Sequence, residues 1–159
     1  MDDIAVARLV HIVAIVHWIG GVSLVTAVLL PAVARFSEPS RRIAVFEEIE
    51  GRFSFQAKIS VTLAGLSGFY MTYRLQAWDR FLDPHFWWMH AMVLVWTIFT
   101  VVLFIAEPFF LHAWFRNRAA RDPDGTFALI QRAHWVLLSV SVLTIGGAAL
   151  GGHGVYFWG

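Results

Sequence analysis

Two histidines lie inside the first long apolar stretch of the chain, in the segment HIVAIVHWIGG at positions 11–21. Polar, proton-binding side chains are costly in hydrocarbon and usually have a partner there. His11 and His17 are separated by about 240° around a helix at 100° per residue, so they face different neighbours. Imidazole is a ligand of haem iron and of copper, and a bound metal is therefore one partner that these residues suggest.

Other histidines occur near the ends of later apolar stretches, and His90 has the same expected depth as His11. Neutral imidazoles at one depth on two helices are what the axial ligation of haem requires. We therefore expect His11 and His90 to bind a haem b iron, with His17 as the replacement ligand if either assignment fails. A second haem between His112 and His134, which share the opposite side of the membrane, is an alternative.

Charged side chains near the membrane boundaries add to this site. Arg8, Arg74 and Arg80 fall on the side of His11 and are candidates to bind the haem propionates, because a guanidinium group binds carboxylates bidentately. Lys58 and Glu107 fall near the other boundary, on two different apolar stretches. We expect these two side chains to pair with each other or to extend toward the interface.

Copper is the alternative metal. Met89 and Met92 flank His90, and Met71 lies near the same side of the membrane. Thioethers suit Cu(I), but the chain has no cysteine, the other ligand that a copper transporter normally offers. The absence of cysteine also excludes disulfides, iron–sulfur clusters and thiolate metal sites.

The composition is that of an integral membrane protein. Of the 159 residues, 58% are hydrophobic and 14% charged, and the mean hydropathy is +0.65. Soluble domains are about 25% charged. Four segments are long enough to cross a hydrocarbon core of about 30 Å as helices, which predicts an all-α four-helix bundle forming one domain over residues 1–159. These segments are roughly 4–34, 53–75, 85–114 and 127–151.

Two local features refine this arrangement. The segment at about 40–50 has apolar residues on one face and is expected to be a separate amphipathic helix at the interface. Pro108, near the end of the third predicted span, is expected to kink it.

The basic residues predict the orientation. Nine of the 12 Lys and Arg residues lie in or beside the loops after the first and third spans, and these loops are therefore expected to be cytoplasmic. Both termini would face the outer, periplasmic side of a bacterial inner membrane. The nine are Arg35, Arg41, Arg42, Arg52, Lys58, Arg116, Arg118, Arg121 and Arg132.

Four segments together resemble the CopD-like and HemJ-like superfamily of small four-helix membrane proteins. They are HIVAIVHWIGG, KISVTLAGLSGFYM at 58–71, WWMHAMVLVW at 87–96 and RAHWVLLSVSVLTIGGAALGGHG at 132–154. HemJ-type proteins are protoporphyrinogen oxidases that bind haem b, and the resemblance implies His11 as a ligand and Lys58 as the required, catalytic lysine. CopD-type proteins are associated with copper import. Met92 stands where the HemJ pattern has a lysine, so haem binding rather than protoporphyrinogen oxidation is expected here.

The expected function is that of a b-type cytochrome or haem-dependent membrane oxidoreductase, which exchanges electrons with quinone or an outer-side redox protein. The alternatives are a copper-handling transporter and a cofactor-free subunit that anchors a larger complex. A homodimer or larger complex would help four helices to shield a large cofactor from the lipid bilayer. The sequence has no basic nucleic-acid footprint, phosphate loop or Ser-His-Asp constellation, so those classes are set aside.

Overall fold

The first apolar stretch folds into one continuous helical rod in the computed structural model, which describes residues 2–155. The rod comprises α1 (Asp3–Leu24), a π-helical turn (Val25–Leu29) and α2 (Leu30–Phe36). The carboxylate of Asp2 caps its start by accepting a hydrogen bond of 3.1 Å from the Ile4 N–H, which satisfies one of the free donors of the first turn.

The second rod is longer than the sequence predicts. Helix α3 runs without interruption from Arg42 to Arg74, so the separate interfacial helix at about 40–50 and the predicted span from residue 53 form one element. The segment between them contains no proline, and Gly51 keeps a negative φ, so nothing there ends the helix. The boundary that we predicted is therefore absent.

The third rod comprises α4 (Trp87–Val101), a π-helical stretch (Val102–Leu111) and α5 (His112–Ala119). Pro108 lies inside the π-helical stretch, where we expected a kink. Proline cannot donate a backbone hydrogen bond, and its ring crowds the preceding turn. A local π-helical register, which is wider than the α-helix, adjusts the backbone around this interruption. Two short 3-10 turns, Asp79–Leu82 and Pro84–Phe86, connect α3 to this rod.

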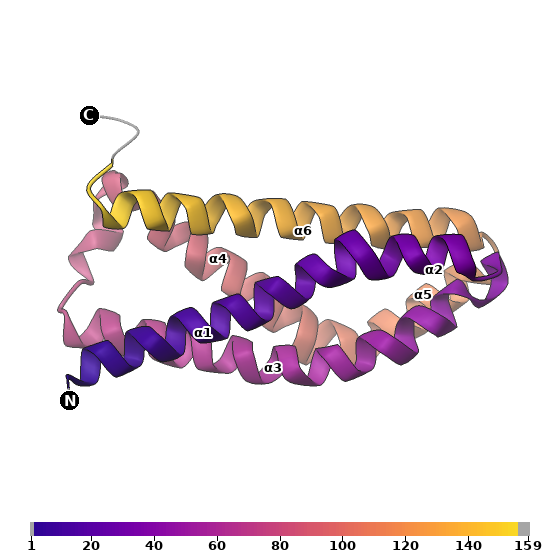
Figure 1. Ribbon diagram of the computed structural model, residues 1–159, viewed down its shortest axis with the longest axis horizontal. Helices are drawn as coiled ribbons and strands as arrows, with labels where there is room; N and C mark the ends of the chain where they lie inside the picture. The colour runs from indigo at the N-terminus through magenta and orange to yellow at the C-terminus, as the bar shows by residue number, and fades with distance from the viewer. Residues whose placement is uncertain (1, 156–159) are drawn as a thin grey trace.

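The fourth rod is α6, from Pro123 to Gly152, and its first residues are typical of a helix N-terminus. Pro123 occupies the first turn, and the side chain of Asp122 accepts a hydrogen bond of 2.9 Å from the Gly125 N–H. The four rods lie along one another, with the start of α1 and the end of α6 at the same end of the bundle (Figure 1). We call this the terminal end, and the end with the connections 37–41 and 120–122 the loop end.

Three of the rods are long and apolar enough to cross a membrane, namely Asp3–Phe36, Pro84–Ala119 and Pro123–Gly152. Large apolar side chains such as Val16 and Leu143, 66% and 70% exposed, face outward, as contact with lipid requires. The protein is thus a helical multi-pass membrane protein, as predicted. Helix α3 is not among these three, because it carries seven charged residues, including Lys58, and is less apolar than the other rods.

The interior is packed around small residues that let the rods approach closely. Ala14 of α1 and Ala57 and Ala64 of α3 are buried in the central apolar cluster. Between α4 and α6, a Cβ added at Gly147 would lie 2.5 Å from the ring of Trp87, and one at Gly151 would lie 2.3 Å from the ring of Trp88. The glycines near the end of α6 thus make room for indole rings.

Gly65 gives a direct test of this packing. A Cβ at Gly65 would lie 2.6 Å from the ring of Trp96, whose indole N–H donates a 2.9 Å hydrogen bond to the carbonyl of Val61. We expect Gly65→Val to destabilise the protein by about 1–3 kcal/mol, the usual cost of an overpacked interior. Thermal unfolding in detergent measures this effect. Gly20→Val is the matched control, because a Cβ there meets nothing within 4 Å, and equal effects of the two substitutions would contradict the packing argument.

Candidate functional site

His11 extends from α1 toward α3 and is held there by a hydrogen bond to the backbone. Its Nδ1 lies 2.9 Å from the carbonyl oxygen of Ala64 and 3.1 Å from the hydroxyl of Ser67. A carbonyl oxygen only accepts, so Nδ1 carries the proton and donates it to Ala64, and the lone pair is on Nε2. Metal-binding histidines are usually oriented by a hydrogen bond of this kind.

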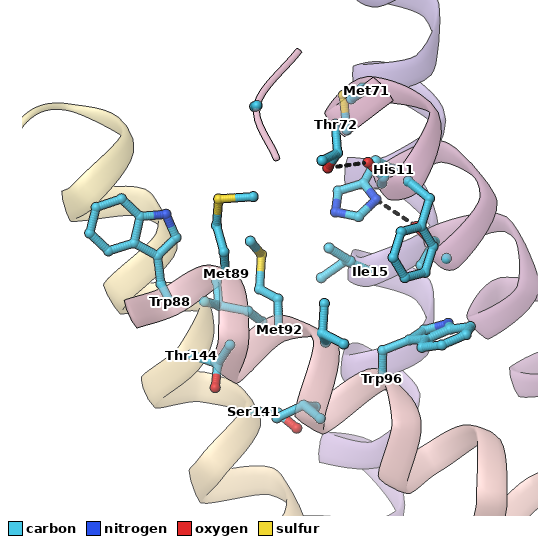
Figure 2. Close-up of a pocket in the computed structure, with 18 of the residues that line it drawn as sticks. His11, Ile15, Met71, Thr72, Trp88, Met89, Met92, Trp96, Ser141 and Thr144 are labelled. Carbon is cyan, nitrogen blue, oxygen red and sulfur yellow. Dashed lines mark hydrogen bonds between the residues drawn. The ribbon is translucent and has the colours of Figure 1, made fainter. Parts of the chain in front are cut away.

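The ring of His11 lines a cavity of about 280 Å³ among α1, α3, α4 and α6. Three of the four methionines of the chain, Met71, Met89 and Met92, line the same space. In Figure 2 the side chains of Met89 and Met92 extend from α4 into the space that the His11 ring borders from the opposite side. We call this space the histidine–methionine cavity. It lies toward the terminal end of the bundle and is otherwise lined mainly by apolar and aromatic side chains.

His90, the predicted partner of His11, does not line this cavity. Its side chain is exposed, and its ring contacts Phe81 edge-to-face at a centroid distance of 5.3 Å. Met89 and Met92 are three residues apart and share one face of α4, whereas His90 points about 100° away from Met89. The structure therefore brings methionines, and not His90, to the space beside His11.

The other site residues predicted on the same side of the membrane as His11 are not all at the histidine–methionine cavity. His17, the replacement ligand, is exposed, and its Nδ1 lies 2.8 Å from the hydroxyl of Ser60. Arg80 lines the histidine–methionine cavity. Arg74 is held by Asp3 in an ion pair, and Arg8 is exposed and does not line the cavity. Of the three arginines proposed for the propionates, only Arg80 is at the cavity.

A second cavity of about 260 Å³ lies nearer the loop end, and its lining includes Glu47, Glu50, Glu107, His112 and His134. We call it the carboxylate cavity. The pairing of Lys58 with Glu107 is confirmed, since Lys58 Nζ lies 3.4 Å from Glu107 Oε2. His112 and His134, the predicted ligands of a second haem, both line this cavity.

The polar groups of the carboxylate cavity are connected to one another. The Ser54 hydroxyl donates a 2.6 Å hydrogen bond to Glu107 Oε1. Nδ1 of His112 lies 3.2 Å from Glu47, and Nε2 lies 3.8 Å from Glu107 Oε1. The carboxylate of Glu50 lies close to Glu107 and His112, with one ligand atom of each residue within 4.8 Å of the others. Two carboxylates at this spacing make an added positive charge favourable.

The polar contact of His134 is local to its own helix. Its Nδ1 lies 2.9 Å from the carbonyl oxygen of Ile130, one turn earlier in α6, so this nitrogen donates to the backbone. The ring of His134 also contacts Phe46 edge-to-face at a centroid distance of 5.7 Å.

Three buried serines of α3 contact the polar side chains of other helices, and sequence reasoning did not single them out. Ser54 binds Glu107, Ser60 lies against His17, and Ser67 lies against His11. Serines at helix interfaces in membranes commonly form such contacts. The signal in the sequence is the presence of small polar residues at 54, 60 and 67 along α3, together with histidines on another span.

Trp18 borders both cavities and has an unusual polar atom. Its side chain is 4% exposed, and its indole N–H finds no hydrogen-bond partner within residues 2–155. A buried donor without a partner is costly, so a ligand atom that accepts from it would be stabilised.

The chain matches no protein-family model, no curated protein and no solved structure at a significant level.

Proposed function

We propose that the protein is a membrane haem b protein, a b-type cytochrome or haem-dependent oxidoreductase, in which His11 would bind the haem iron. One observation carries this proposal: the Nδ1–H of His11 donates to the Ala64 carbonyl, and the ring lines a cavity that also holds methionine thioethers. Imidazole with a thioether is an established pair of axial ligands for haem iron. Met89 or Met92, rather than His90, is then the second ligand.

The residues around the histidine–methionine cavity fit a flat, largely apolar cofactor. Gly65 and Gly68 line it, and a Cβ at Gly68 would lie 3.0 Å from the His11 ring, so the ring stands close against α3. Arg80 supplies a guanidinium for a propionate. The volume of about 280 Å³ is close to the lower limit of roughly 300–1,000 Å³ for small-molecule sites.

In this proposal a bound haem would supply one-electron chemistry. The protein residues would hold and tune it: His11 would donate its Nε2 lone pair, a thioether ligand would raise the reduction potential, and the apolar lining would exclude water. Quinone or a redox protein at the terminal end would be the partner. A homodimer or larger complex in a bacterial inner membrane, with both termini outside, is part of the same proposal.

Copper handling is the second candidate, and the methionines favour it. One imidazole and three thioethers, from His11, Met71, Met89 and Met92, are a soft donor set of the type that selects Cu(I). A single ion does not need a cavity of this volume, so haem remains the first candidate. A second haem between His112 and His134 has less support, because Glu50 and Glu107 would repel its propionates.

The visible spectrum and the metal content of the purified protein test both candidates. We expect protein from haem-replete cells to have a Soret band and, after reduction with dithionite, the α-band of a low-spin haem b. The pyridine haemochrome should give one haem per chain. Colourless protein would refute the haem proposal. Cu(I) bound at one equivalent by that protein, and lost in the variant Met89→Leu/Met92→Leu, would establish the copper candidate.

A further inference from the structure

We propose that Glu50, Glu107 and His112 form a binding site for a divalent transition-metal ion such as Zn²⁺ in the carboxylate cavity. One ligand atom from each residue lies within 4.8 Å of the other two. Ligands held tetrahedrally at ~2.0–2.2 Å from zinc lie about 3.4 Å apart, so small side-chain movements would close the site. This site is separate from the histidine–methionine cavity and does not depend on what that cavity binds.

The donor atoms have the chemistry of a zinc site. Imidazole nitrogen and carboxylate oxygen are both ligands of zinc in proteins, and the imidazole disfavours Ca²⁺ and Mg²⁺, which take oxygen ligands. The three side chains come from different elements: Glu50 from α3, Glu107 from the π-helical stretch, and His112 from the start of α5. Glu107 is 9% exposed and Glu50 and His112 are half-buried, so an ion here would be partly shielded from water.

His112 is oriented as a metal ligand. Its Nδ1 lies 3.2 Å from one carboxylate oxygen of Glu47, and Arg116 binds the other oxygen at 3.3 Å. A carboxylate that accepts from Nδ1 fixes the ring and leaves Nε2 as the donor to a metal. Nε2 in fact faces Glu107 Oε1 at 3.8 Å, close to the spacing of two ligands on one ion.

The charges around the cavity favour a cation. Glu47, Glu50 and Glu107 supply three carboxylates, whereas Lys58 and Arg116 supply two positive charges. Lys58 lies against Oε2 of Glu107, so Oε1 remains on the side of His112. The carboxylate of Glu50 forms no hydrogen bond or ion pair with any side chain in the described range, although it lies beside Glu107. A bound dication would neutralise both carboxylates.

Calorimetric titration of the full-length, chelator-treated protein with Zn²⁺ tests the site. We expect one equivalent of Zn²⁺ to bind per chain, with binding lost in Glu50→Gln and in His112→Ala. Glu47→Gln should weaken it by about 10–100-fold, the usual effect of removing the group that orients a ligand. Glu48→Gln is the matched control, because Glu48 is exposed on the same helix, and it should bind like the wild type.

Lys58→Met separates a metal site from a merely structural cluster. Removing this ammonium group reduces the positive charge beside Glu107, so Zn²⁺ should bind more tightly and should raise the unfolding temperature of the variant more than that of the wild type. Two results would overturn the proposal: no stoichiometric Zn²⁺ uptake by the wild type, or uptake that persists unchanged in both Glu50→Gln and His112→Ala.

Discussion

His11→Ala is expected to lose haem, whereas His90→Ala is expected to keep it. His11 lines the histidine–methionine cavity with its proton on Nδ1, but His90 is exposed and does not line it. Loss of an iron–imidazole bond should lower haem affinity by at least about tenfold, since ~1.4 kcal/mol already corresponds to that factor. The measurement is the Soret absorbance per chain of each purified variant after haem reconstitution.

The controls for this experiment distinguish ligation from folding. His17→Ala removes another exposed imidazole of the same helix and should leave the spectrum unchanged. Free imidazole added to His11→Gly should restore a low-spin spectrum, which a misfolded protein would not do. Loss of haem in His90→Ala with retention in His11→Ala would reverse the assignment, and loss in both would support the bis-histidine pairing predicted from the sequence.

Lys58→Met is expected to destabilise the protein by about 2 kcal/mol. Removing one partner of a buried ion pair typically costs 3–5 kcal/mol, and the value here is lower because the Lys58 side chain is 29% exposed. Glu107, whose side chain is 10% exposed, would retain Ser54 but lose its nearest ammonium group. Thermal unfolding in detergent without added metal measures the change.

A double substitution that also removes the charge of Glu107 tests this prediction. Lys58→Met/Glu107→Gln should recover most of the lost stability, because the unpaired buried charge is then removed. Arg74→Met is the comparison at an exposed ion pair, in which Arg74 and Asp3 are each 43% exposed, and it should cost about 0.5 kcal/mol. If the double variant is as unstable as Lys58→Met alone, the loss has another cause.

Much of the fold could be predicted from apolar length alone. The first, third and fourth predicted spans correspond to three rods, each within a few residues at most boundaries. The sequence led us to predict two helices, at about 40–50 and from residue 53, where the structure has one. An amphipathic pattern followed by an apolar pattern indicates a change of environment, but it does not require the helix to end. Only a proline or another helix-ending residue would have marked an end.

The candidate site was predictable in part. His11, Lys58 and Glu107 stood out because polar groups in an apolar stretch need partners, and the pairing of Lys58 with Glu107 was one of the two arrangements expected for them. The position of Met89 and Met92 beside His11 was not predicted. Their spacing places them on one face of α4 but does not indicate which face turns inward. That rotation depends on tertiary packing, here on the seating of Trp88 against α6.

The buried serines of α3 have a consequence for biogenesis. Helix α3 carries seven charged residues, more than any other rod, and its buried serines add to its polarity, so its transfer from the translocon into lipid is the least favourable on its own. Ser60 and Ser67 meet their histidine partners only where α1 is already present. We therefore expect α1 to wait beside the translocon and α3 to enter the bilayer with it as a helical hairpin, so that the polar groups of each helix help to insert the other.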